Sequence, residues 1–77
     1  MNEVKKKILE KLLDEDPFLL AIIKGQEGMI TTHFYMIVME TVREECPDGS
    51  YSIEEVRELM NDETLRGVWG IPERKFA

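Results

Sequence analysis

Cysteine is almost absent from this chain of 77 residues, since Cys46 is the only one. A single thiol cannot form an internal disulfide, so nothing in the sequence requires an oxidising compartment, and we expect a cytoplasmic protein. Histidine is equally scarce, with His33 alone. A structural zinc site needs about four cysteine or histidine ligands. We therefore expect no such metal site and no other cofactor.

Long apolar runs are missing as well. No stretch approaches the roughly 18 apolar residues that a membrane-spanning helix needs. The first thirteen residues are interrupted by lysines at positions 5, 6, 7 and 11, so they do not have the apolar centre of a signal peptide. We expect a protein that does not enter a membrane.

Basic residues are few: ten lysines and arginines stand against sixteen acids, for a net charge of −6. The acids concentrate between Glu40 and Glu63, where Arg43 and Arg57 are the only basic residues. Direct nucleic-acid binding depends on clustered lysine and arginine, so we do not expect it. The acidic stretch is either a solvated helix surface or a mimic of nucleic acid that attracts a basic protein.

Catalytic groups are also scarce. General acid–base and nucleophilic catalysis need a base or nucleophile within hydrogen-bond reach of an orienting partner. His33 follows two threonines at the expected start of a helix, and Cys46 follows two glutamates at the negative end of a helix, an environment that does not activate its thiol. No phosphate-binding glycine motif is present. We expect that the protein is not an enzyme.

Helical patterning is what the sequence does contain. Apolar residues recur at helical spacing in five segments, which proline and glycine separate. The first expected helix ends at Leu13, and the second begins at Pro17 and stops at Gly25. The third is capped by Thr31 or Thr32 and runs to about Cys46. The fourth starts at Ser52, and the fifth is capped by Asn61 or Asp62 and ends at Gly70.

These segments predict an all-α fold, a compact bundle of four to five short helices with the third helix at its centre. So short a chain can build only one core. We therefore expect residues 1–77 to form a single helical domain, with residues 70–77 as a C-terminal tail.

The second and third segments carry more apolar residues than one helix face can hold. Between Phe18 and Ile23 every residue is apolar, so this helix must be covered. In the third segment Met36 and Ile37 fall on the same side as charged residues, and either the second helix or a partner covers them. The expected core arc of the third helix consists of Phe34, Tyr35, Val38, Met39, Val42 and Cys46.

The clearest local signal is a capping box, with Ser52 and Glu55 at the required spacing. Tyr51 and Val56 stand at the spacing of a hydrophobic staple before the same helix. The inner face of this helix is expected to consist of Ile53, Val56, Leu59 and Met60.

The segment from Glu44 to Glu55 also resembles the calcium-binding loop of an EF-hand. Asp48, Gly49 and Glu55 fall at positions five, six and twelve of that loop, where such loops have an oxygen ligand, a glycine and a glutamate. Glu44 at position one and Cys46 at position three depart from the pattern. The resemblance implies a degenerate calcium site at Asp48 and Glu55, whereas the capping box implies a simple connection between helices.

For function, these observations favour a small non-enzymatic module for protein–protein interaction, a regulator or inhibitor that acts through an apolar or an acidic helical surface. Self-association as a homodimer through Met36, Ile37 and the second helix is one form of this hypothesis. The alternatives are an acidic mimic of nucleic acid and the EF-hand-like calcium binder. Trp69 either closes the core or anchors an interface. The candidate partner-binding residues are Met36, Ile37, Glu54, Glu55, Glu58 and Trp69.

Overall fold

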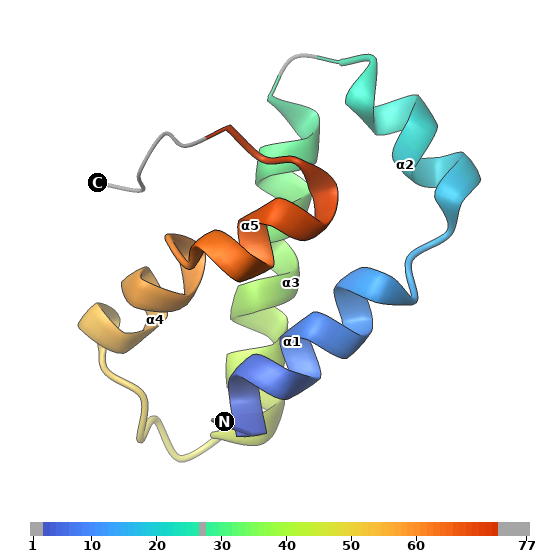
Figure 1. Cartoon of the computed structure of the whole chain (residues 1–77). Coiled ribbons are helices and arrows are strands. Elements are labelled where there is room, and N and C mark those ends of the chain that lie inside the picture. The colour runs from blue at the N-terminus through green and yellow to red at the C-terminus, as the bar shows by residue number, and fades with distance from the viewer. Residues whose placement is uncertain (1–2, 27, 73–77) are drawn as a thin grey trace.

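The computed structural model of the chain describes residues 3–26 and 28–72. Within these ranges the chain forms five helices and no strand: α1 (Glu3–Leu13), α2 (Pro17–Lys24), α3 (Met29–Glu45), α4 (Ile53–Met60) and α5 (Glu63–Trp69). The longest helix, α3, runs through the molecule and packs against α1, α2 and α4 (Figure 1). The prediction of an all-α bundle with a central third helix is confirmed.

The starts of three helices are fixed by side chains that the sequence shows directly. Before α2, the Asp16 carboxylate accepts a hydrogen bond of 2.8 Å from the Phe18 backbone N–H. Before α4, the Ser52 hydroxyl accepts from the Glu55 N–H, and the Glu55 carboxylate accepts from the Ser52 N–H, each at 3.1 Å. Before α5, Asp62 accepts from the Leu65 N–H at 3.0 Å. These caps satisfy N–H groups that have no partner within the helix.

The start of α3 differs from the prediction, because neither Thr31 nor Thr32 caps it. The helix begins at Met29, and Gly28 before it has a left-handed backbone with φ +79°. Glycine adopts this conformation without steric cost, so the chain turns directly into the helix. Thr32 is already inside the first turn, where its hydroxyl donates to the Gly28 carbonyl at 3.0 Å.

One hydrophobic core joins α1, α3, α4 and α5. Its buried side chains are Val4, Ile8 and Leu12 of α1, Phe34, Ile37 and Val38 of α3, Leu59 and Met60 of α4, Leu65 and Trp69 of α5, and Ile71 after α5.

The core arc of α3 is turned relative to the predicted arc. Phe34 and Val38 are fully buried as expected, but Met39 is 48% exposed and Ile37 is buried. Ile37 lies three residues after Phe34 and four before Thr41, which is also fully buried, so these three form one stripe. Because α1 packs along α3, apolar burial extends to this stripe and leaves Met39 outside the core.

The inner face predicted for α4 is only partly correct. Leu59 and Met60 are buried and Val56 is half-buried, but Ile53 is 78% exposed. Ile53 is the first residue of α4, and this helix reaches the core through its last turn. The prediction for Ile53 is therefore wrong.

The first residues of the predicted C-terminal tail are packed. Gly70 ends α5 in a left-handed conformation with φ +69°. The chain then turns back, so that Ile71 is buried in the core and the Pro72 carbonyl accepts a hydrogen bond from Arg66 at 2.7 Å. Within the predicted tail, Ile71 therefore packs with the helices and Pro72 is exposed, while residues 73–77 lie outside the described residues.

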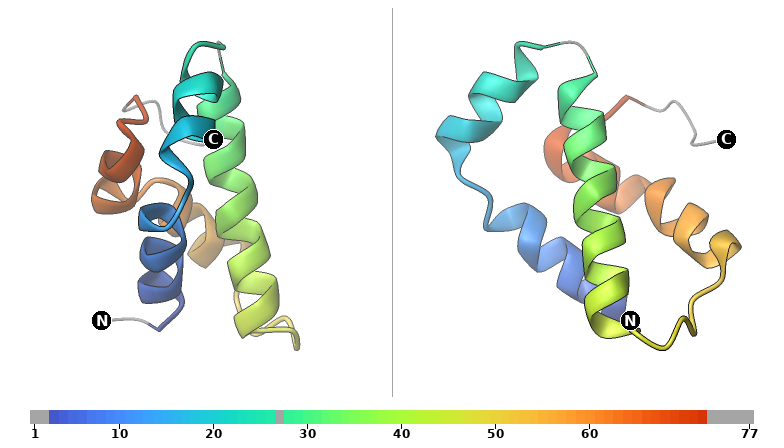
Figure 2. Two further views of the ribbon diagram at one scale, coloured as in Figure 1. Left: turned by 90° about the vertical axis from the view of Figure 1, so that its right-hand side faces the viewer. Right: turned by 180° about the vertical axis from the view of Figure 1, so that it is seen from behind.

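Helix α2 occupies a peripheral position. It stands beside the first half of α3, at the end of the molecule away from α4 (Figures 1 and 2). Of its eight residues, all of them described, only Ile23 is buried, and Leu20 packs against the core from its edge. The rest of this apolar helix is not covered by any other described part of the chain.

Candidate functional site

Most of the exposed large apolar side chains in the described residues lie on α2 and α3, which pack against each other. Large hydrophobic side chains are exposed on both helices, with Phe18 at 73% and Met36 at 52%. We call the following six residues the α2–α3 apolar surface: Phe18, Leu19 and Ile22 of α2, and Met29, Met36 and Met39 of α3.

Helical geometry explains why these side chains face outward. In α2 the inward positions are taken by Leu20 and Ile23, which leaves the other apolar residues turned to solvent. In α3, Met29 and Met36 are seven residues apart and Met39 follows three residues later, so all three lie on one face of the helix. That face is opposite the buried stripe around Phe34 and Val38.

This part of the chain is also poor in charge. Between Pro17 and Met39, Lys24 and Glu27 are the only residues of the Asp, Glu, Lys and Arg types, and they cancel. The whole net charge of −6 therefore comes from the rest of the sequence. A large apolar face with almost no charge is typical of the centre of a protein–protein interface.

The structure separates the two neighbouring residues that the sequence paired as a candidate site. Met36 is exposed and belongs to the α2–α3 apolar surface, whereas Ile37 is only 7% exposed and packs in the core. A partner cannot contact the Ile37 side chain without opening the core. We therefore leave Ile37 out of the candidate surface.

Trp69, the third apolar candidate, is 3% exposed and closes the core. Its indole N–H donates to the Leu12 carbonyl at 3.0 Å, and the His33 ring stacks on the indole with 5.4 Å between the ring centroids. His33 Nε2 is buried, has no hydrogen-bond partner and lies 3.6 Å from a carboxylate oxygen of Glu15. Trp69 was expected either to close the core or to anchor an interface, and in the structure it closes the core.

The acidic candidates Glu54, Glu55 and Glu58 all lie exposed on α4. The Glu55 carboxylate accepts from the Ser52 N–H, so it already has a structural role. Glu54 and Glu58 border an open hollow together with Arg57, whose positive charge lies within the acidic surface.

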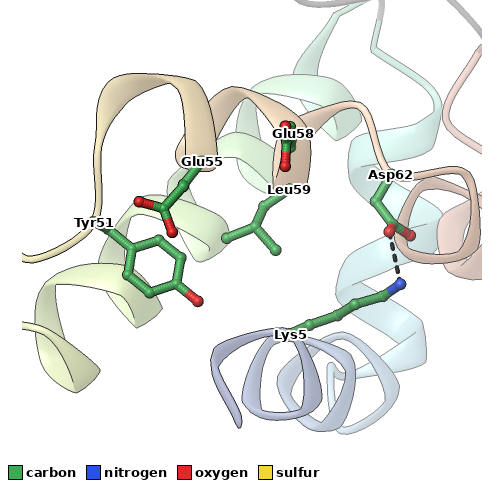
Figure 3. A pocket seen from close by; sticks show the side chains of 6 residues that line it. All are labelled: Lys5, Tyr51, Glu55, Glu58, Leu59 and Asp62. Carbon is green, nitrogen blue, oxygen red and sulfur yellow. Dashed lines mark ion pairs between the residues drawn. The ribbon is translucent and has the colours of Figure 1, made fainter. Parts of the chain in front are cut away.

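A second hollow, of about 200 Å³, lies between α1 and α4 and is lined by Lys5, Tyr51, Glu55, Glu58, Leu59 and Asp62 (Figure 3). The ion pair between Lys5 Nζ and Asp62 Oδ2 closes one end at 2.7 Å. Partial burial alone would raise the pKa of Asp62, but the hydrogen bond and charge of Lys5, with the backbone N–H of Leu65, hold this pKa below its usual value. These contacts link α1 to the start of α5.

Arg66 is a structural residue that the sequence did not reveal. It is buried in α5, where its guanidinium donates to the Tyr35 hydroxyl at 3.0 Å and to the Met60 and Pro72 carbonyls at 2.7 Å each. The guanidinium also lies near the Phe34 and Tyr35 rings. No sequence signal distinguishes Arg66 from an exposed arginine in the last turn of a helix, since its acceptors are distant along the chain.

The residues of the EF-hand-like segment form local turns. The Asp48 carboxylate accepts from the Ser50 N–H at 3.0 Å, and the Glu55 carboxylate serves the capping box. Among the described residues, no group of three or more His, Cys, Asp and Glu side chains is placed to hold a metal ion.

Two further findings concern the chain as a whole. In the part of the chain that the structure describes, no helix has both the length and the apolar composition needed to cross a membrane. Comparison of the chain with models of protein families, with curated proteins and with solved structures finds no match.

Proposed function

We propose that this protein is a small protein-interaction module that binds its partner through the α2–α3 apolar surface. The observation that supports this most strongly is the state of α2, an apolar helix with Phe18, Leu19 and Ile22 exposed. Soluble monomers rarely expose large contiguous apolar patches, and those that exist are often binding sites. A module of this kind acts by holding or occupying its partner, as a regulator or inhibitor does.

The composition of the surface supports a protein partner. Phe18 offers an aromatic anchor of the kind that dominates interface energetics. The three methionines of α3 have flexible, polarisable side chains that repack against differently shaped partners. No strongly charged groups interrupt the centre of the surface, so desolvation on binding costs little.

The acidic surface of α4 is less suited to lead the interaction. Glu55 is engaged in the capping box, and Arg57 lies beside Glu54 and Glu58. A mimic of nucleic acid depends on an unbroken negative field. We therefore assign the binding role to the apolar surface.

Site-specific photo-crosslinking in cells that produce the protein tests this proposal. A photoreactive phenylalanine analogue is placed at position 18 in one variant and at position 53 in a matched control. Both positions carry exposed apolar residues, but Ile53 is on α4, away from α2. We expect a discrete protein adduct, with any partner including a second copy, from position 18 and none from position 53.

A second variant separates the apolar from the acidic surface. Glu54, Glu55 and Glu58 are replaced together by glutamine, which removes three charges while glutamine at position 55 preserves the capping box. The adduct from position 18 should persist in this background. Equal adducts from positions 18 and 53, or loss of the adduct in the glutamine variant, would contradict the proposal.

A further inference from the structure

We infer that the partner of the α2–α3 apolar surface is a second copy of this chain, and that two copies pair through their α2 helices in antiparallel orientation. This inference rests on the proposed function and names the partner of the same surface.

The size of the surface suits a dimer. If a fully exposed large apolar side chain offers roughly 200 Å², the exposed fractions of the six residues correspond to about 600 Å². Stable interfaces bury about 600–1,000 Å² on each partner. The six residues together reach the lower end of this range only if the pair buries the α3 methionines as well as the exposed side of α2.

The distribution of charge permits self-association of a chain that is strongly acidic overall. Two molecules with a net charge of −6 repel each other over most of their surfaces. The segment from Pro17 to Met39 has no net charge, so this face allows the closest approach of two copies. An acidic protein that binds a basic partner would instead be expected to use the acidic stretch from Glu40 to Glu63.

The two ends of α2 are complementary in charge, which selects the antiparallel orientation. Asp14 and Asp16 precede the helix and Lys24 ends it, and all three are exposed. When two copies of α2 pair antiparallel about a twofold axis, Lys24 of each lies near the acidic end of the other. A parallel pair would bring like charges together at both ends. The helix dipoles favour the same orientation.

A symmetric pair also explains why so short and apolar a helix is stable on the surface. An isolated helix of eight residues does not form in water, and most helix stability in proteins comes from packing of the apolar face. In one chain α2 packs against α3, with Ile23 buried and Leu20 packed at the edge of the core. A twofold partner covers the opposite side, where Phe18 and Ile22 are exposed.

Sedimentation equilibrium of the purified full-length chain, over low to high micromolar concentrations, tests the inference. We expect a monomer–dimer equilibrium with the dimer predominant at the upper end. Replacement of Phe18 and Ile22 together by serine should raise the dissociation constant at least a hundredfold. The near-ultraviolet circular dichroism of Trp69 reports whether this variant keeps its core. The matched control is Ile53→Ser, which removes an equally exposed apolar side chain from α4 and should leave the dissociation constant unchanged.

Charge exchange tests the orientation. Lys24→Glu should raise the dissociation constant about tenfold, because glutamate would face the acidic end of the partner. Adding Asp14→Lys to this variant should restore it, and Asp16 is left in place because it caps α2. Failure of the second change to restore the dimer overturns the antiparallel pairing.

The remaining outcomes separate this inference from the proposed function. A chain that stays monomeric throughout the concentration range, or a dimer that survives the Phe18 and Ile22 double substitution, overturns the inference. If the chain is monomeric but position 18 still forms an adduct with a different protein in cells, the proposed function stands without the dimer. If no adduct forms at position 18, the proposed function fails as well.

Discussion

The imidazole of His33 lies nearly parallel to the indole of Trp69, with 7° between the ring planes. This stack joins α3 to α5 beside the end of α1, where the indole N–H donates to the Leu12 carbonyl. Two rings from helices far apart in the sequence thus close one end of the core. The only histidine has a structural environment and no hydrogen-bond partner at its buried Nε2.

Replacement of His33 by alanine should remove the stack and loosen the indole. Aromatic pairs contribute about 0.5–1.5 kcal/mol beyond their burial, so we expect a loss of about 1 kcal/mol in the free energy of unfolding and a weaker near-ultraviolet band of Trp69. His33→Phe keeps a flat ring and removes a buried polar atom without a partner. This variant should be at least as stable as the natural chain, and a large destabilisation would show that the contact of Nε2 with the Glu15 carboxylate stabilises the fold.

Replacement of Arg66 by methionine should destabilise the fold by about 2–4 kcal/mol, because the buried Met60 carbonyl and the part-buried Pro72 carbonyl lose a charged donor. Arg66→Lys should also be destabilising, since an ammonium group cannot reproduce the planar fork of the guanidinium. Urea unfolding followed by Trp69 fluorescence measures both. Arg57→Met, an exposed change on α4, is the control and should stay within about 0.5 kcal/mol of the natural chain.

The ion pair of Lys5 and Asp62 should make stability depend on pH in the acid range. The pKa of Asp62 lies below its usual value of 3.8 in the folded chain, so the unfolded chain takes up the proton first. The stabilisation is present above pH 3.8 and is lost as the pH falls further through the folded-state pKa. Since both side chains are partly exposed, we expect a contribution of about 0.5–1 kcal/mol.

Urea unfolding from pH 7 down to pH 2.5 measures this dependence, with Asp62→Asn and Lys5→Met as the informative variants. Asparagine still caps a helix, so Asp62→Asn removes the charge while α5 keeps its start. Both variants should lose stability at neutral pH and should converge with the natural chain in strong acid. A constant difference across the whole pH range would show that the ion pair is not its source.

The features that were predictable from the sequence are those that depend on near neighbours. A capping box needs only Ser52 and Glu55 three residues apart, and Pro17 after Asp16 starts a helix through its own backbone. The side of a helix that becomes buried depends instead on where the other helices pack. The exposure of Met39 and the inward turn of Arg66 follow from tertiary contacts with distant segments, so the sequence pattern did not reveal them.

The same limit applies to the candidate site. The excess of apolar residues in the second and third helices was visible in the sequence, because it requires only a count of apolar positions. Whether α2 is covered by its own chain depends on the path of the loops on either side of it. The structure packs α2 mainly against α3, and this peripheral position leaves its other side exposed.

Met36 and Ile37 provide a direct comparison, because they are adjacent in α3 and differ in burial. Ile37→Ala removes a core side chain and should lower the free energy of unfolding by about 2–4 kcal/mol at every protein concentration. Met36→Ala removes an exposed side chain and should leave the monomer nearly as stable. If the second copy covers Met36, however, this variant should lose the rise in thermal midpoint that dimerisation gives at high protein concentration. Thermal unfolding at several concentrations measures both effects, and a Met36 variant whose midpoint rises with concentration as in the natural chain would place Met36 outside the dimer interface.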